Sequence, residues 1–260
     1  MELGLADKTA VVTGGSEGIG RAIATELSKQ GCNVAIGARR GDVLEQAAQE
    51  IASSTKGHVA AVVTDVAKTG SPEALVEAAV ERFGRLDILV NNAGRSAAYR
   101  FEDATEDIWH EDLQLKLFGA IRTMRAAIPH MRAAGGGSIV NITTVGGKQP
   151  GAESVPTSTS RAAGIALTKA ASKDYAADNI RVNTVMVGSI RSMQSVRVWE
   201  QQASGMTLEE FYTRSGQGIP LGRIGYAEEV ADLVAFMVSE RAVYITGTSI
   251  AIDGGASSVI

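Results

Sequence analysis

The sequence lacks several features that whole classes of protein require. It has one cysteine, Cys32, so no internal disulfide can form, and we expect a packing role for it beside an apolar strand. The three histidines have no metal-ligand spacing, which predicts no metal site. With 25 basic and 29 acidic residues the formal charge is −4, and there is no basic field to grip a nucleic acid.

Long apolar runs are also missing. No segment approaches the roughly 18 consecutive apolar residues of a membrane span. The first residues include Glu2 and Asp7, where a signal peptide needs basic residues. We therefore expect a cytoplasmic protein with no membrane partner.

What the sequence does contain is a regular alternation of short apolar runs and longer helical stretches. The runs rich in β-branched residues predict strands over 9–12, 34–38, 59–63, 88–91, 138–142, 182–187 and 249–252. The stretches between them predict helices over 18–30, 42–54, 71–83, 106–134, 155–178 and 227–239. This alternation is typical of a doubly wound parallel sheet in a three-layer α/β/α arrangement. We expect one domain over residues 1–260.

One segment interrupts the alternation. Residues 189–225 separate the sixth predicted strand from the last predicted helix and hold a short helix, for which Thr207–Glu210 form a capping box. An insertion here overhangs the carboxyl edge of the sheet, where ligands bind in open α/β folds. Because the segment is rich in apolar residues, we expect a substrate lid over a ligand with an apolar part.

A glycine-rich turn, TGGSEGIG at Thr13–Gly20, follows the first predicted strand and leads into a helix. Its glycines at 14, 18 and 20 permit a tight turn and close approach of the backbone to a pyrophosphate. The helix that follows offers free amides and a positive dipole end. The turn therefore predicts a Rossmann-type dinucleotide site.

The second predicted strand ends in Arg39 and Arg40. A carboxylate near this position marks NAD, whereas two guanidinium groups suit a ribose 2′-phosphate. We expect NADP(H) as the cofactor. The alternative is that both arginines only form a solvated strand end.

Several motifs, taken in order, resemble those of the short-chain dehydrogenase/reductase family. They are TGGSEGIG, TDV at 64–66, NNAG at 91–94, SIVNITT at 138–144, RVN at 181–183 and ITGTSIAIDGG at 245–255. The resemblance covers essentially the whole chain. It implies a Rossmann sheet of about seven strands, oxidoreductase activity on a carbonyl or alcohol, and a homotetramer or dimer whose interface includes residues 106–134.

The resemblance also implies which positions contact the cofactor. Asp65 would lie near the adenine, and the NNAG segment would line the nucleotide ribose. The full set expected at the cofactor is Gly14, Ser16, Gly18, Ile19, Gly20, Arg39, Arg40, Asp65, Val66, Asn92, Ala93, Gly94, Gly188 and Ile190.

The chain departs from the family at the positions that carry the chemistry. The family has an Asn, a Ser and a YxxxK pair, in which the tyrosine supplies the proton. By register with the flanking motifs, the serine position is Thr144 and the asparagine position is Lys116. The tyrosine and lysine positions are Thr157 and Arg161, four residues apart on one helix face.

The altered residues differ in their capacity to move a proton. A threonine hydroxyl is about as weak an acid as water, so its pKa would have to fall by about eight units for it to act near neutral pH, and proteins shift pKa values by about 3–5 units. Arg161 does not release its proton. The pKa of Lys116, about 10.4 in model peptides, has to fall by only about three units. We therefore expect Lys116 as general acid and base, Thr144 orienting the substrate carbonyl, and Arg161 binding a ribose or an anion.

Other interpretations remain open from the sequence. Lys116 can instead form a salt bridge to Glu111 or Asp112 on its own helix. The fold can hold the nucleotide without redox chemistry, as a sensor or an oligomer partner, or use its cations to stabilise an enolate as a lyase or isomerase. A reductase can also take its proton from Tyr99 or Tyr212.

The cations of this region also bear on the choice of substrate. With Lys116 and Arg161, Arg191 and Arg197 of the lid favour a pocket suited to a carboxylate or an acyl phosphate. We expect a small-molecule substrate, with an anionic group as one possible feature.

Overall fold

The computed structural model describes residues 2–202 and 205–259. At its centre lies a parallel sheet of seven strands in the order β3-β2-β1-β4-β6-β8-β9. The strands are β1 Thr9–Thr13, β2 Asn33–Ala38, β3 Val59–Val63, β4 Ile88–Asn91, β6 Gly137–Thr144, β8 Ile180–Val187 and β9 Ser249–Ile252. The predicted Rossmann-type α/β fold is confirmed, with all seven predicted strands present.

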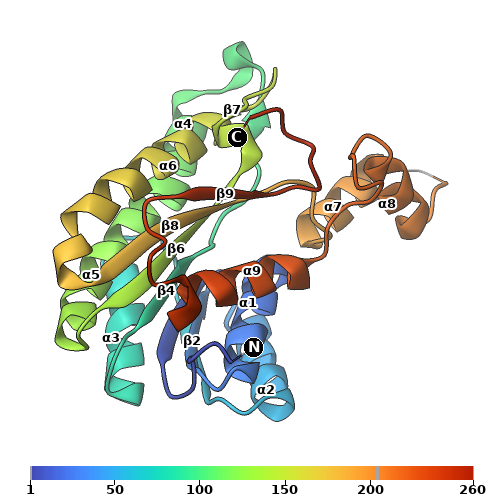
Figure 1. Cartoon of the computed structure of the whole chain (residues 1–260). Helices are drawn as coiled ribbons and strands as arrows, with labels where there is room; N and C mark the ends of the chain where they lie inside the picture. The colour runs from blue at the N-terminus through green and yellow to red at the C-terminus, as the bar shows by residue number, and fades with distance from the viewer. Residues whose placement is uncertain (1, 203–204, 260) are drawn as a thin grey trace.

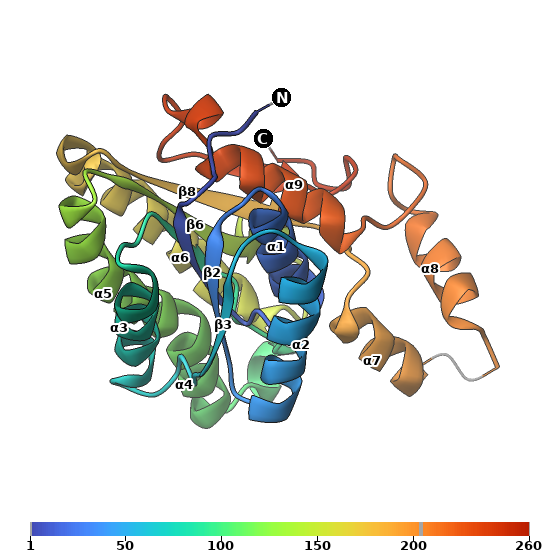
Figure 2. The same ribbon diagram turned by 90° about the horizontal axis from the view of Figure 1, so that it is seen from below.

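Helices cover both faces of the sheet, as Figures 1 and 2 show. One face carries α1 Gly18–Lys29, α2 Gly41–Ser54 and α9 Ala227–Val238. The opposite face carries α3 Ser71–Phe83, α5 Gly119–Ala133 and α6 Thr157–Asp174. Neighbouring residues of one strand supply both cores: Val12 of β1 packs toward α1 and α9, and Val11 packs toward α3 and α5.

The predicted helix over 106–134 is wrong as a single element. The chain forms α4 Glu106–Leu113, a π-helical turn over Gln114–Phe118, and then α5. A π turn keeps the chain helical and needs no glycine or proline, so apolar periodicity alone does not predict it. Such turns are frequent at functional sites, and this one carries Lys116.

A small antiparallel pair lies beside the start of α6. The strands β5 Ala98–Tyr99 and β7 Val155–Pro156 pair Ala98 with Pro156. This pairing brings the loop after β4 against the first residue of α6, Thr157. Short 3₁₀ segments complete the described chain at Phe101–Asp103, Val145–Gly147, Ala176–Asp178 and Glu240–Ala242.

The predicted lid holds two helices rather than one. They are α7 Met193–Gln202 and α8 Leu208–Gly216, which project from one side of the sheet in both views (Figures 1 and 2). The predicted capping box is confirmed, because Thr207 accepts from the Glu210 amide while the Glu210 carboxylate accepts from the Thr207 amide. No helix within residues 2–202 and 205–259 is long and apolar enough to cross a membrane.

Arg191 connects this lid to the main body. Its guanidinium lies 4.5 Å from the ring centroid of Tyr212 on α8 and 4.7 Å from that of Tyr226, the N-cap of α9. It also donates to Glu209 at 2.9 Å. These contacts hold α8 against the start of α9.

Candidate active site

The glycine turn closes tightly at the amino end of α1. Gly14 and Gly18 have φ values of 68° and 54°, which an L side chain rarely adopts. A Cβ at Gly20 would lie 2.1 Å from the Gly14 carbonyl oxygen, so no larger residue fits. Ser16 is buried in the same turn, and Ile19 is half-buried. This cradle and the helix amides fit a dinucleotide pyrophosphate.

The loop after β4 supports the glycine turn directly. The Asn92 side-chain amide donates to the carbonyl oxygens of Thr13 and Gly14 at 3.0 and 3.2 Å. The Thr13 hydroxyl accepts from the amides of Asn92 and Ala93 at 3.0 and 3.1 Å. The Asn92 side chain therefore holds the turn in shape, and Thr13, which the sequence analysis did not single out, is its main partner.

The residues expected near the adenosine of the cofactor lie at the carboxyl ends of β2 and β3. Asp65 accepts from the Ala67 amide at 3.1 Å and so shapes its own loop, while Val66 is buried. Arg39 is exposed. Arg40 forms an ion pair with Glu17 of the glycine turn, so a phosphate at this place has to compete with that carboxylate.

The lid reaches the far side of the groove. Gly188 has no room for a side chain, because a Cβ there would lie 2.6 Å from the Cβ of Asp253, and Ile190 is buried. Gln194 of α7 donates to the Gly94 carbonyl at 3.4 Å. The start of α7 thus lies against the NNAG segment.

At the reaction end, Lys116 reaches Thr157 from inside the protein. Its side chain is 0% exposed and forms an ion pair with Asp112. Its amine also donates to Thr157 Oγ1 at 2.7 Å. The Ala97 amide donates to the same oxygen at 2.9 Å.

This geometry determines what the Thr157 hydroxyl is able to do. A hydroxyl has two lone pairs and one proton. Lys116 and Ala97 occupy both lone pairs, so Thr157 is left with its proton to donate. The half-buried side chain therefore presents a donor whose oxygen is polarised by an ammonium group.

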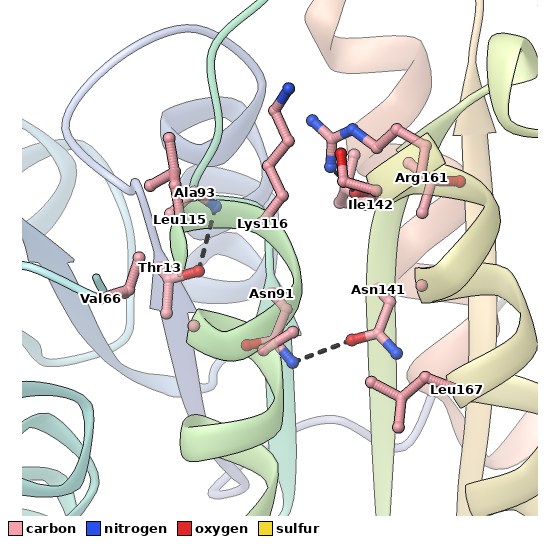
Figure 3. A pocket seen from close by; sticks show the side chains of 15 residues that line it. Thr13, Val66, Asn91, Ala93, Leu115, Lys116, Asn141, Ile142, Arg161 and Leu167 are labelled. Atoms are coloured by element: carbon pink, nitrogen blue, oxygen red, sulfur yellow. Dashed lines mark hydrogen bonds between the residues drawn. The ribbon is translucent and has the colours of Figure 1, made fainter. Parts of the chain in front are cut away.

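Lys116 and Arg161 line one cavity between α5 and α6, where Figure 3 shows their side chains reaching the same end from opposite sides. Burial and the nearby Arg161 lower the pKa of Lys116 to about 8, and Asp112 opposes that shift. Burial lowers the pKa of Arg161 to about 10. At neutral pH both groups carry their protons.

Arg161 approaches the NNAG segment closely. It donates to the Ile142 carbonyl at 2.8 Å, and its Nε has no hydrogen-bond partner among the described residues. A Cβ at Gly94 would lie 2.7 Å from the Arg161 Nη2 atom. Gly94 is thus required for the arginine to lie where it does.

The other residues considered for the chemistry lie around this cluster or away from it. Thr144 ends β6 and is half-buried, and Tyr99 of β5 is exposed. Tyr212 is buried in the lid, with its hydroxyl 3.5 Å from Ser195 Oγ. Arg197 is exposed on α7.

The sequence analysis treated a Lys116–Asp112 salt bridge as an alternative to a role in proton transfer, whereas the structure shows the salt bridge and the Thr157 contact together. Glu111, the other candidate partner, pairs with Arg95 instead. Ser160, which donates to Asp112 at 2.6 Å, was missed. For the Asp112–Lys116 pair, the signal in the sequence was the four-residue spacing, which places both side chains on one helix face.

Known proteins agree with this fold. A family model described as enoyl-(acyl carrier protein) reductase matches residues 14–257. Dehydrogenase/reductase SDR family member 4 of Oryctolagus cuniculus is 33% identical over 255 residues, covering 98% of this chain and 95% of the relative. L-rhamnose 1-dehydrogenase (NAD(P)(+)) of Azotobacter vinelandii is 34% identical over 255 residues, covering 96% and 97%.

Among solved structures, L-sorbose reductase of Gluconobacter frateurii, in complex with NADPH and L-sorbose, superposes with a TM-score of 0.96. It is 32% identical, and the match covers 100% of both chains. The chain therefore belongs to the short-chain dehydrogenase/reductase family of NAD(P)-dependent oxidoreductases.

Proposed function

We propose that the protein is an NADP(H)-dependent oxidoreductase that interconverts a carbonyl compound and its alcohol, with Lys116 as the proton source and the Thr157 hydroxyl as the group that delivers the proton. The observation that carries this proposal is the Thr157 oxygen, whose lone pairs are occupied by Lys116 and Ala97. Its proton is left free for a substrate oxygen.

When bound, a dihydronicotinamide would supply the hydride for reduction of the substrate carbonyl. Thr157 donates a hydrogen bond to the carbonyl oxygen and transfers its proton as negative charge develops there. Lys116 transfers a proton to the Thr157 oxygen in the same step, which leaves a neutral amine beside Asp112. The substrate gains one hydride and one proton, and solvent later returns a proton to Lys116.

This relay addresses the weak acidity of threonine. A free Thr157 alkoxide never forms, because the ammonium group replaces the proton as it leaves. The pKa of the true proton source, Lys116, is lowered to about 8 by burial and Arg161. A donor with a pKa close to the working pH is efficient in general acid catalysis.

For the cofactor we propose NADP(H) over NAD(H). Arg39 and Arg40 lie at the end of β2, where the 2′-phosphate of a bound cofactor is expected. The sorbose reductase relative was solved with NADPH, while the name of the rhamnose dehydrogenase relative includes both cofactors. The glycine cradle, Asp65, Val66, Gly94, Gly188 and Ile190 complete the proposed cofactor contacts.

For the substrate we propose a small carbonyl compound that needs no anionic group. Two of the four cations have carboxylate partners, Asp112 for Lys116 and Glu209 for Arg191. Arg161 donates to the Ile142 carbonyl, and Arg197 is exposed on α7. A set of keto acids and their esters tests this point with NADPH oxidation as the readout. Similar rates for acid and ester agree with the proposal, whereas a strong preference for the acids contradicts it.

We also propose a homo-oligomer in the cytoplasm.

Lys116→Met tests the proton source, with Lys173→Met as the matched change at an exposed lysine of α6. We expect NADPH to bind both variants with unchanged affinity. Carbonyl-dependent NADPH oxidation should fall by about 100-fold or more in Lys116→Met alone. Unchanged turnover in Lys116→Met would exclude Lys116.

Thr157→Val and Thr157→Ser separate the relay from its surroundings. Valine has the shape of threonine without the hydroxyl, so turnover should fall as far as in Lys116→Met. Serine retains the hydroxyl and should retain most of the rate. A Thr157→Val enzyme as active as the wild type would place the proton donor elsewhere. A wild-type protein that binds NADPH without turnover would favour a role as a sensor.

A further inference from the structure

Asp112 is a buried carboxylate with a partner on each oxygen. Its side chain is 1% exposed, and Oδ1 forms the ion pair with Lys116. Its Oδ2 accepts from Ser160 Oγ at 2.6 Å. Asp112 belongs to α4 and Ser160 to α6, so the carboxylate joins the two helical segments that carry the reaction end of the site.

Stability alone does not account for this buried pair. Removing two charges from water costs free energy that their attraction roughly offsets, and apolar replacements of similar size are often neutral or stabilising. The Lys116 amine also makes two hydrogen bonds at once, one to Asp112 and one to Thr157. The same amine is therefore held by one group and directed at the other.

The carboxylate fixes the direction of that amine. A lysine side chain has four rotatable bonds, and its ammonium is a point charge without a preferred orientation. Asp112 lies four residues before Lys116, across the π turn, and limits where Nζ can lie. Ser160 in turn limits rotation of the carboxylate, so Nζ stays 2.7 Å from Thr157 Oγ1.

The charged groups that face Lys116 come from three elements. Arg161 from α6 and Arg95 from the loop after β4 favour loss of its proton, as does burial. Asp112 from α4 favours the charged form. Glu111 pairs with Arg95 near the surface. Asp112, which contacts the Lys116 amine directly, is thus the anion that opposes the effect of the two arginines on the Lys116 pKa.

We propose that Asp112 is a positioning residue, which directs the Lys116 amine at the Thr157 hydroxyl and retains a proton on that amine, with Ser160 holding the carboxylate in place. The inference rests on the proposed function for its catalytic meaning. Its physical content, the effect of Asp112 on the amine, is measurable without any substrate.

The experiment follows the Lys116 side-chain ¹⁵N resonance with pH in the full-length protein. The signal is assigned as the one of eight lysine signals that is missing in Lys116→Met. Asp112→Asn removes the charge and keeps the size, and the titration midpoint should fall by about one pH unit or more. Ser160→Ala retains the carboxylate and should shift the midpoint much less, while Asp112→Glu should restore most of it. An unchanged midpoint in Asp112→Asn would overturn the inference.

A kinetic readout adds the link to catalysis. In the carbonyl-reducing direction, the fall of kcat/KM at high pH should move to lower pH in Asp112→Asn by the same amount as the NMR midpoint, with NADPH affinity unchanged. A uniform loss of rate at all pH values would instead indicate a purely structural role and contradict the proposal. Turnover that survives in Lys116→Met refutes the proposed function and leaves the NMR result standing.

If Asp112→Asn does not fold, the double variant Lys116→Met/Asp112→Asn decides. Removing one member of a buried pair leaves an uncompensated charge, whereas removing both does not. Folding of the double variant alone supports the dependence of Lys116 on Asp112. Failure of both variants to fold would contradict it, because Asp112 would then be needed for reasons unrelated to Lys116.

Discussion

The two ends of the groove differ in how they are built. The pyrophosphate end consists of backbone and glycines, held by Thr13 and Asn92, and follows the pattern of its family closely. The proposed reaction end consists of charged side chains from three helical segments: Asp112 pairs with Lys116 and favours its protonated form, whereas Arg161 favours loss of that proton. The first end therefore depends on space that no side chain may fill, whereas the second depends on a balance among the charges around Lys116.

Gly20→Ala tests the glycine turn and has the largest expected effect. The added Cβ would lie 2.1 Å from the Gly14 carbonyl oxygen and 2.4 Å from the Asn92 side-chain nitrogen. We expect loss of NADPH binding and a decrease of about 3 kcal/mol or more in the free energy of unfolding, measured by urea denaturation. Gly218→Ala, where no atom lies within 4 Å, is the matched control and should change neither. Normal NADPH affinity in Gly20→Ala would show that the turn has room to spare.

Lys116→Met tests the charged end of the site through the pH dependence of the free energy of unfolding. The pKa of Lys116 is about 8 in the folded protein, below its usual 10.5, so the unfolded chain binds more protons between these values. Stability due to this group therefore rises as pH increases from about 8 to 10.5, by about 3 kcal/mol in total. The rise should be absent in Lys116→Met, measured as the difference between the urea unfolding curves of the two proteins at each pH.

That difference removes contributions common to both proteins, including that of Cys32, whose thiol pKa is raised by burial to about 12. Parallel curves for wild type and Lys116→Met over this range would mean that the Lys116 pKa is not lowered in the folded state.

Glu17→Gln sharpens the comparison at the adenosine side and has the smallest expected effect. Glu17 pairs with Arg40, and a 2′-phosphate has to displace it. Exposed ion pairs contribute about 0.2–1 kcal/mol, so the dissociation constant for NADPH should fall by about 1.4- to fivefold, with that for NADH unchanged. Glu50→Gln, which removes an exposed pair with Arg21 on α1, is the control. Equal improvement for NADH and NADPH would show that Arg40 does not contact the 2′-phosphate.

The fold and the pyrophosphate end were predictable from sequence because their causes are local. Apolar runs, helical stretches and glycines at 14, 18 and 20 each specify a short segment, and parallel strands then align their carboxyl ends. The capping box of α8 was also predictable, because it needs only four adjacent residues.

The reaction end was harder to predict from the sequence, because its contacts join segments that are far apart along the chain. The hydrogen bond from Ser160 to Asp112 joins residues 48 apart in the sequence, and that from Lys116 to Thr157 joins residues 41 apart. The π turn that places Lys116 leaves no sign in the apolar pattern. From the sequence, Lys116 was a candidate by its register and by the modest pKa shift it needs, with Asp112 as one possible partner, whereas its contact with Thr157 and the bond from Ser160 to Asp112 appear only in the folded chain.

The most direct test of the account is a fluorescence titration of the purified protein with NADPH and with NADH. The account predicts saturable binding of both, with NADPH bound about tenfold more tightly because Arg39 and Arg40 meet the 2′-phosphate. If neither nucleotide binds, the central claim is contradicted and the cluster around Lys116 is left without a hydride donor.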